Sequence, residues 1–261
     1  MSNLALAVRD SSTMLRRNLL HARRYPSLTL NLLLTPVMLL LLFVYVFGEA
    51  MSAGIGGGDR SDYIAYIVPG LLLMTIGSTT IGTAVSVSND MTEGIIARFR
   101  TMAIHRGSVL VGHVVGSVIQ SIMSVVLVGA VGVAIGFRSA DATALEWLAA
   151  FGLLVLFTLA LTWIAVGMGL VSPNAEAASN NALPLIFLPL ISSAFVPIDS
   201  MPGWFQPIAE YQPFTPAIET LRGLLLGTEI GHNGWLALVW SVALTALGYF
   251  WATAKFNDDP K

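Results

Sequence analysis

The chain has 261 residues, of which 55% are hydrophobic and only 11% are charged, and its net charge at pH 7 is −2. Soluble domains average about 25% charged residues, so this composition excludes a domain that faces water on all sides. The 13 lysines and arginines are too few for the broad basic face of a nucleic-acid-binding protein, and the lack of cysteine excludes disulfides and thiolate nucleophiles. A mean hydropathy of +0.76 predicts an all-α integral membrane protein.

Residues 1–26 precede the first long apolar run and are rich in arginine. Apolar side chains recur at helical spacing between the arginines, at Leu4, Val8, Leu15, Leu19 and Leu20. This pattern predicts an amphipathic helix in contact with lipids at the membrane interface, with an ordinary positively charged flank as the alternative. The apolar run that follows is long enough to span a membrane, so we expect it to stay as an anchor rather than be removed as a signal peptide.

Six segments are expected to cross the membrane, since a spanning helix needs roughly 20 apolar residues. They are 28–47, 64–87, 108–137, 145–171, 180–196 and 235–254. The segment 180–196 is the shortest and contains Pro184 and Pro189, so we expect a kinked helix there, supported by its neighbours. No repeat or long polar linker divides these segments, and we interpret residues 1–261 as a single transmembrane domain.

The distribution of basic residues predicts the orientation of the chain. With six spans both termini lie on one side, and that side would hold ten of the 13 lysines and arginines. Cytoplasmic loops carry such an excess, so both termini are predicted to be cytoplasmic in a multi-pass protein of the plasma or inner membrane.

The polar segment 88–107, between the second and third spans, is therefore predicted to be cytoplasmic. Asn89 or Asp90 can cap a helix, and Glu93 follows Asp90 at capping-box spacing. Along that helix Met91, Ile95, Phe99 and Met102 would line one apolar face, while Arg98 and Arg100 project elsewhere. Such a face could be buried in the bilayer interface, against the chain's own spans or in a groove of a partner, and spacing alone leaves these alternatives open.

The chain contains no nucleotide-binding motif of its own. The sequence G-x-x-x-x-G-K-[ST] is absent, and the only lysines are Lys255 and Lys261. Any ATP-driven work would need a second polypeptide to supply the nucleotide site, and we expect this chain not to be an enzyme.

The segment 197–232 is predicted to be an exoplasmic re-entrant or interfacial hairpin. It is rich in proline and in aromatic residues that suit the membrane interface, and it contains two short amphipathic pieces, 203–211 and 216–226. Glu219 and Arg222 stand three residues apart and are expected to form a surface ion pair rather than a substrate contact.

These features together resemble a known family. The stretch NDMTEGIIARFRTMAIHRGSVLVGHVV, residues 89–115, resembles a part of that family in which a polar helix is followed by an R-F-R-[ST]-M-like turn and then by a span. Residues 172–225, SPNAEAASNNALPLIFLPLISSAFVPIDSMPGWFQPIAEYQPFTPAIETLRGLL, resemble a short loop, a kinked fifth helix and a proline-aromatic hairpin. With the basic N-terminal segment, the chain resembles the membrane subunit of an ABC-2 type ABC exporter, in particular the daunorubicin-resistance permease branch. It departs from the family at Ala103, where proline is frequent, and at Ser172–Glu176.

The resemblance implies a permease that exports a drug or lipid and is powered by a separate ATP-binding subunit. Two such subunits would hold ATP and Mg²⁺, this chain would hold no cofactor or metal, and two permease copies would form a homodimer. The coupling helix that docks on the ATP-binding subunit would use Asp90, Met91, Glu93, Ile95, Arg98, Phe99, Arg100 and Met102, and the N-terminal interface would use Arg16, Arg17, Arg23 and Arg24.

The substrate path implied by the resemblance lies between the two permease copies. Its candidate contacts are Thr79 and Thr83 in the second span and Phe187 and Phe195 in the fifth. Few ionisable groups lie deep in the spans, which disfavours an ion-driven carrier. The alternatives are a polysaccharide or glycolipid exporter of the same superfamily and a non-transporting membrane assembly subunit.

Overall fold

The computed structural model describes residues 26–48, 60–94, 106–139 and 141–257, and these residues form helices and turns without any β-strand. The predicted all-α class is therefore confirmed for the described chain. The predicted N-terminal helix lies outside these residues, with Arg16, Arg17, Arg23 and Arg24. The same holds for five of the predicted docking residues, Ile95, Arg98, Phe99, Arg100 and Met102.

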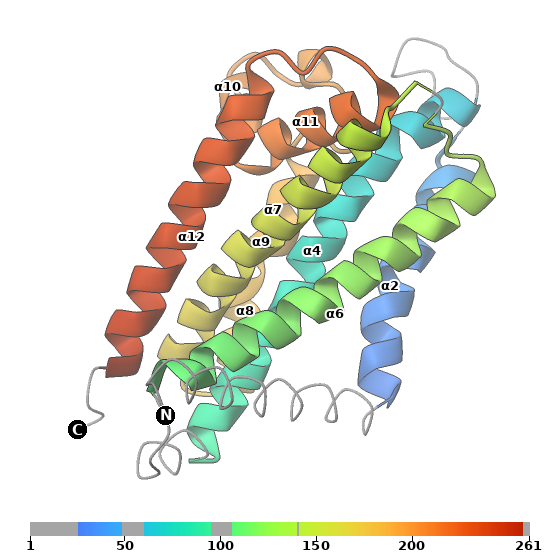
Figure 1. Cartoon of the computed structure of the whole chain (residues 1–261). Coiled ribbons are helices and arrows are strands. Elements are labelled where there is room, and N and C mark those ends of the chain that lie inside the picture. The colour runs from blue at the N-terminus through green and yellow to red at the C-terminus, as the bar shows by residue number, and fades with distance from the viewer. Residues whose placement is uncertain (1–25, 49–59, 95–105, 140, 258–261) are drawn as a thin grey trace.

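The long helices run side by side along a single bundle, as Figure 1 shows. They are α2 (Pro26–Tyr45), α4 (Arg60–Thr92), α6 (Arg106–Ile135), α7 (Ala144–Val171) and α12 (Asn233–Asn257). Among the described residues, α4, α6, α7 and α12 are long and apolar enough to cross a membrane, and α2 contributes a shorter apolar stretch, Leu34–Tyr45.

Helix α4 is the centre of the bundle. It contacts α2, α6 and α7, and three of the shorter helices that follow in the chain, which span 175–182, 184–190 and 214–226. In its most apolar stretch 78% of the residues are buried, compared with 22% in α12 and 28% in α6. Helices α6 and α12 instead expose large apolar side chains, such as Met123, Val126, Val242 and Phe250. Such side chains suit a lipid environment, so α4 is shielded by protein while α6 and α12 form the outer surface.

Small residues allow the helices around α4 to approach closely. A Cβ atom on Gly77 would lie 2.2 Å from the carbonyl oxygen of Leu185, and one on Gly70 would lie 2.7 Å from Ala194. Further along α4, a Cβ on Gly169 of α7 would lie 2.5 Å from the carbonyl oxygen of Ala84. Close contact at small residues is the main way in which membrane helices pack.

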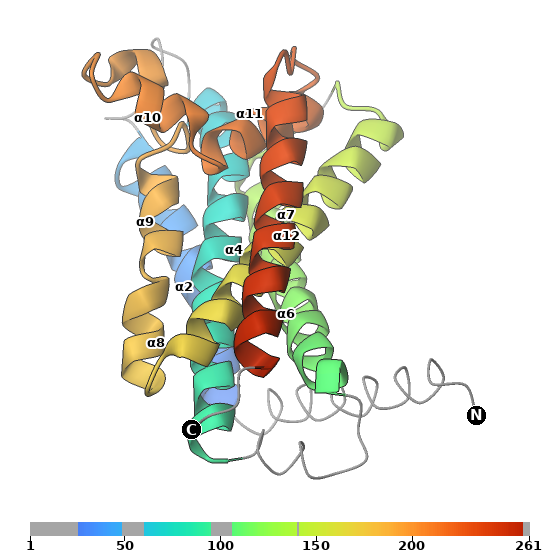
Figure 2. The ribbon, with the colours of Figure 1, turned by 90° about the vertical axis from the view of Figure 1, so that its left-hand side faces the viewer.

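The proline-containing fifth segment forms two helices rather than one kinked helix. Helix α8 (Ala175–Ala182) begins at Asn174, whose side chain accepts the N–H of Ala177, and α9 (Pro184–Leu190) follows after Leu183. Figure 2 shows the two stacked along one edge of the bundle. Pro184 cannot donate a backbone hydrogen bond, so the helix is interrupted there, and residues 191–196 form turns.

The predicted hairpin forms short helices at one end of the bundle. They are the 3₁₀ turn η2 (Ile198–Ser200), α10 (Gln206–Tyr211) and α11 (Phe214–Leu226). Helices α10 and α11 match the predicted pieces 203–211 and 216–226 within a few residues. Helix α11 lies across the bundle end in Figures 1 and 2 and contacts α4, α7 and α12. It ends at Gly227, whose φ of +67° is a conformation that favours glycine.

Candidate functional site

Helix α4 continues beyond the predicted end of its span, so the helix start predicted at residues 89–90 is wrong. Gly94 follows the helix with a φ of +68°, the left-handed conformation typical of a residue just after a helix C-terminus. The carbonyl oxygen of Asn89 accepts hydrogen bonds from the N–H of Glu93 and the hydroxyl of Thr92. Asn89 and Asp90 therefore belong to the last turns of α4 and cap no new helix.

Asp90 and His113 connect the end of α4 to the first turns of α6. The Nε2 atom of His113 lies 2.9 Å from Oδ2 of Asp90. Only 4% of the His113 side chain and 12% of the Asp90 side chain are exposed. A buried carboxylate needs a hydrogen-bonding partner, because losing its hydration without compensation is costly. This contact therefore holds together the two helices that flank residues 95–105.

An apolar cluster joins four helices at the same end of the bundle. It consists of Val87 on α4, Leu110 and Val114 on α6, Trp163 and Val166 on α7, and Ala252 and Phe256 on α12. Met91 is half-buried against this cluster, whereas Glu93 is exposed. Of the predicted docking residues that the structure describes, Met91 thus packs on the chain's own helices and Glu93 is accessible from outside.

A second polar contact joins the end of α4 to the loop between α7 and α8. The hydroxyl of Ser88 donates to the carbonyl oxygen of Ser172 over 3.4 Å, and Nδ2 of Asn181 donates to the Ser172 hydroxyl over 3.0 Å. The end of α4 is thereby fixed on two sides, at α6 and at the loop before α8.

The two predicted path threonines lie inside the bundle. Thr79 is 7% exposed, and its hydroxyl oxygen lies 2.7 Å from the hydroxyl of Ser121 on α6. Thr83 is also buried. In this structure Thr79 therefore connects α4 to α6, a packing role that is common for hydroxyl groups in membrane helices.

The two predicted path phenylalanines lie in different surroundings. Phe195 is 6% exposed, and its ring centroid lies 4.5 Å from that of Phe43 on α2. Phe187 on α9 is 56% exposed. The structure does not bring the four path candidates together on one surface of a single copy.

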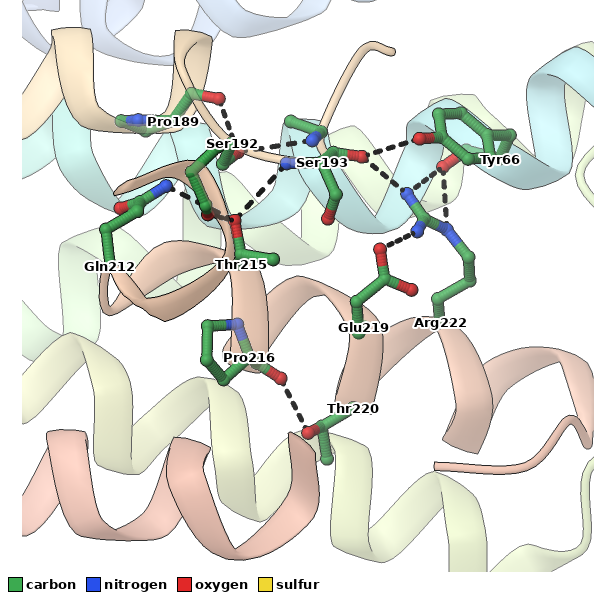
Figure 3. Close-up of polar contacts among 12 residues, drawn as sticks. Tyr66, Pro189, Ser192, Ser193, Gln212, Thr215, Pro216, Glu219, Thr220 and Arg222 are labelled. Carbon is green, nitrogen blue, oxygen red and sulfur yellow. Dashed lines mark hydrogen bonds and ion pairs between the residues drawn. The ribbon is translucent and has the colours of Figure 1, made fainter. Parts of the chain in front are cut away.

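At the opposite end of the bundle, Arg222 forms a buried polar network (Figure 3). Its guanidinium donates to the carbonyl oxygens of Tyr66 and Ser193 and to Oε1 of Glu219, at distances of 2.5–3.3 Å. It also stacks on the Tyr66 ring at 3.9 Å, and Arg222 is only 9% exposed. The prediction of a surface ion pair is therefore wrong: Glu219 and Arg222 do pair, but Arg222 is buried because it satisfies carbonyl groups of two other segments.

Gln212 and Thr215 extend this polar network towards α9. The Nε2 atom of Gln212 donates to the carbonyl oxygen of Leu188 over 3.2 Å, and the N–H of Ser193 donates to the Thr215 hydroxyl over 3.3 Å. Figure 3 shows the second of these contacts, which joins Thr215 to Ser193 in the turn after α9. Neither residue was predicted from the sequence, where the available signal is Gln212 directly before Pro213 and Thr215 two positions after it.

A polar cleft of about 490 Å³ opens beside Arg222. Its lining includes the carboxylates of Asp199, Glu210 and Glu219 and the side chain of His232. No group of three or more histidine, aspartate or glutamate side chains in the described part of the chain is arranged to hold a metal ion.

The helical bundle and its apolar outer surface define a multi-pass membrane protein. Comparison with protein families matches residues 10–226 to the ABC-2 type transporter family. The chain therefore belongs to this family and is the transmembrane subunit of an ABC exporter, and membership implies a partner subunit that binds ATP.

Individual relatives carry names of the same kind. The daunorubicin resistance ABC transporter permease protein DrrB1 of Streptomyces coeruleorubidus is 29% identical over 247 residues, which cover 93% of this chain and 84% of the relative. The probable doxorubicin resistance permease DrrC of Mycobacterium tuberculosis is 25% identical over 68% of this chain and 64% of its own length. The putative transport permease ycf38 of Cyanophora paradoxa is 24% identical over 93% of this chain and 80% of the relative.

Proposed function

We propose that this permease exports a hydrophobic or amphiphilic compound, such as a drug or a lipid, out of the cytoplasm or the inner leaflet. The similarity along 93% of the chain to a permease named for daunorubicin resistance carries this proposal. The exposed aromatic side chains of the hairpin, such as Trp204 at 76% exposure, are compatible with such a compound.

The energy comes from two copies of a separate ATP-binding subunit, which hold ATP and Mg²⁺. Two copies of the permease form a homodimer, and each places both termini in the cytoplasm. In this arrangement six segments cross the membrane, with α8 and α9 together counted as the fifth. The excess of basic residues in 1–26, 88–107 and the C-terminus supports this orientation.

The ATP-binding subunit binds the segment between α4 and α6. Asp90 and Met91, which pack on the chain's own helices, support this segment from within. The contacts with the subunit are Glu93, Ile95, Arg98, Phe99, Arg100 and Met102, with further contacts from Arg16, Arg17, Arg23 and Arg24. Closure of the ATP-binding subunits displaces this segment, and α4 carries the displacement because it runs from that end to the Arg222 network at the other.

The path for the compound lies between the two permease copies. Phe187 supports this position, since it is exposed on the surface of one copy and can contact a compound beside a second copy. Thr79, Thr83 and Phe195 are buried in one copy, so they reach the path only when α4 and the segment after α9 move.

The test is purification of the tagged permease in mild detergent, with ATP hydrolysis as the assay. We expect an ATP-hydrolysing subunit to co-purify and doxorubicin to stimulate its activity in liposomes. Phe99→Asp puts a charge on the apolar face predicted for residues 91–102 and should abolish co-purification, because a carboxylate resists burial in an interface. Ile208→Asp is the matched control, since Ile208 is 52% exposed on α10 at the opposite end of the bundle, and it should keep the subunit bound.

Two results would contradict parts of this proposal. If no ATP-hydrolysing subunit accompanies the unmodified permease, the energy source is wrong. If the subunit remains bound to Phe99→Asp, the docking site lies elsewhere on the chain.

A further inference from the structure

The Asp90–His113 contact is surrounded by apolar side chains on both helices. Val87 and Met91 flank Asp90 along α4, and Leu110 and Val114 flank His113 along α6, all within or against the same apolar cluster. Apolar side chains of similar volume commonly fill such a position with equal or greater stability than a buried polar pair. The pair is better explained by geometry, because it fixes one helix at a defined position on its neighbour.

Asp90 and His113 lie near the ends of their helices, next to the segment that separates α4 from α6. Asp90 lies one helical turn before Gly94, where α4 has ended, and His113 lies about two turns into α6. The pair thus joins the two helix ends that precede and follow residues 95–105. Deeper in the bundle, the 2.7 Å contact between Thr79 and Ser121 joins the same two helices again.

We propose that Asp90 and His113 are positioning residues that couple the ATP-binding subunit to transport. Their contact makes the end of α4 and the start of α6 move as one body when residues 95–105 are displaced. Without it the two helix ends separate, and the displacement is absorbed locally instead of reaching the path. The inference rests on the proposed function in one respect, that an ATP-binding subunit acts on residues 95–105.

The first test measures doxorubicin transported per ATP hydrolysed, in liposomes that contain the permease and its co-purified subunit. Asp90→Ala and His113→Ala should each lower this ratio by about fivefold or more, while the bound amount of the subunit stays unchanged. The exchange of both residues, Asp90→His with His113→Asp, should restore much of the ratio because it rebuilds the pair. Glu229→Ala removes an exposed carboxylate at the opposite end and is the control that should change nothing.

The second test keeps the proposal open to refutation even if the alanine variants transport poorly for other reasons. Because the chain has no cysteine of its own, a pair of spin labels attaches solely to the introduced Asn89→Cys and Val111→Cys. These replace exposed residues near the two helix ends and outside the docking contacts. In the otherwise unmodified complex, ATP should leave the distance between the labels unchanged. In Asp90→Ala, ATP should broaden or shift the distance distribution.

The outcomes separate this inference from the proposed function. If no ATP-binding subunit co-purifies, the proposed function fails and the inference falls with it. If the subunit binds and doxorubicin is transported, but ATP changes the label distance in the unmodified complex, the inference alone is overturned. A transport ratio that is unaffected in Asp90→Ala and His113→Ala overturns it as well.

Discussion

Arg222 shows how a single buried side chain can hold three chain segments. From α11 it donates to the carbonyl oxygen of Tyr66 on α4 and to that of Ser193 after α9, while Glu219 balances its charge. A planar guanidinium with donors on three nitrogens can make these contacts at once, whereas the ammonium of lysine is a compact point charge.

Arg222→Lys should therefore destabilise the protein even though the charge is kept. We expect a loss of about 2 kcal/mol or more in the free energy of unfolding, since buried carbonyl groups lose their donors. Unfolding of the purified protein in mixed detergent micelles measures this loss. Arg138→Lys, at an exposed arginine, is the control and should change the value by no more than about 0.5 kcal/mol. Equal effects of the two exchanges would show that Arg222 is not a structural connection.

At the scale of single residues, the sequence predicted contacts only between residues that are close together in the chain. The spacing of Glu219 and Arg222 correctly indicated that they pair, because residues three apart share a helix face. The other partners of Arg222 are 156 and 29 positions away, at Tyr66 and Ser193, and no local pattern connects them. The contact between Asp90 and His113 was missed for the same reason.

At the scale of the helices, close approach to α4 depends on its few glycines, whose side chain is a single hydrogen atom. At Gly77 the helix lies against the backbone of Leu185, which begins α9 together with Pro184. Backbone cannot move aside as a flexible side chain can, so this contact fixes the distance between α4 and α9.

Gly77→Ala should consequently destabilise the bundle despite the higher helix propensity of alanine. The added Cβ would lie 2.2 Å from the carbonyl oxygen of Leu185, and overpacking of this kind costs about 1–3 kcal/mol or more. Gly152→Ala on α7 is the matched control, since nothing lies within 4 Å of its Cβ position, and it should be neutral or stabilising by up to about 1 kcal/mol. Thermal unfolding in detergent compares the two, and a neutral Gly77→Ala would mean that α9 can shift away from α4.

Helix positions were largely predictable, whereas helix ends were not. Apolar length located α4, α6, α7 and α12, and the prolines indicated the interruption that separates α8 from α9. Residues 89–94 carry both a start signal, in Asp90 and Glu93, and a stop signal, in Gly94. Val87 and Met91 pack against the apolar cluster, and this packing extends α4 so that the stop signal prevails over the start signal. Such packing joins residues that are distant in the sequence, so no local pattern predicts it.

For the molecule as a whole, orientation in the membrane is the most direct prediction still to be tested. The absence of cysteine makes single-cysteine labelling unambiguous. Glu229→Cys, at an exposed position after α11, should react with a membrane-impermeant thiol reagent in intact cells, and Asn257→Cys, at the exposed end of α12, only in inside-out vesicles. The unmodified chain, which should not react, is the control, and the reverse pattern would place the termini outside.

Composition alone predicted the class of the whole molecule, because 11% charged residues cannot cover a water-soluble surface. The arrangement of α11 across the bundle end was beyond such reasoning. It depends on contacts with α12, which follows it in the chain, and with α4 and α7, which are distant in the sequence.

The interruption between α8 and α9 also constrains how the protein is made. In a lipid environment every backbone carbonyl must find a donor within the protein. The carbonyl oxygens of Leu188 and Ser193 accept hydrogen bonds from the N–H of Ile191 and the hydroxyl of Tyr66, both of which are synthesised before the hairpin. Gln212 and Arg222 add a second donor to each carbonyl, and both residues are synthesised later. The segment around α9 can therefore enter the membrane early, and it reaches its full set of hydrogen bonds only after the hairpin that follows it has been synthesised.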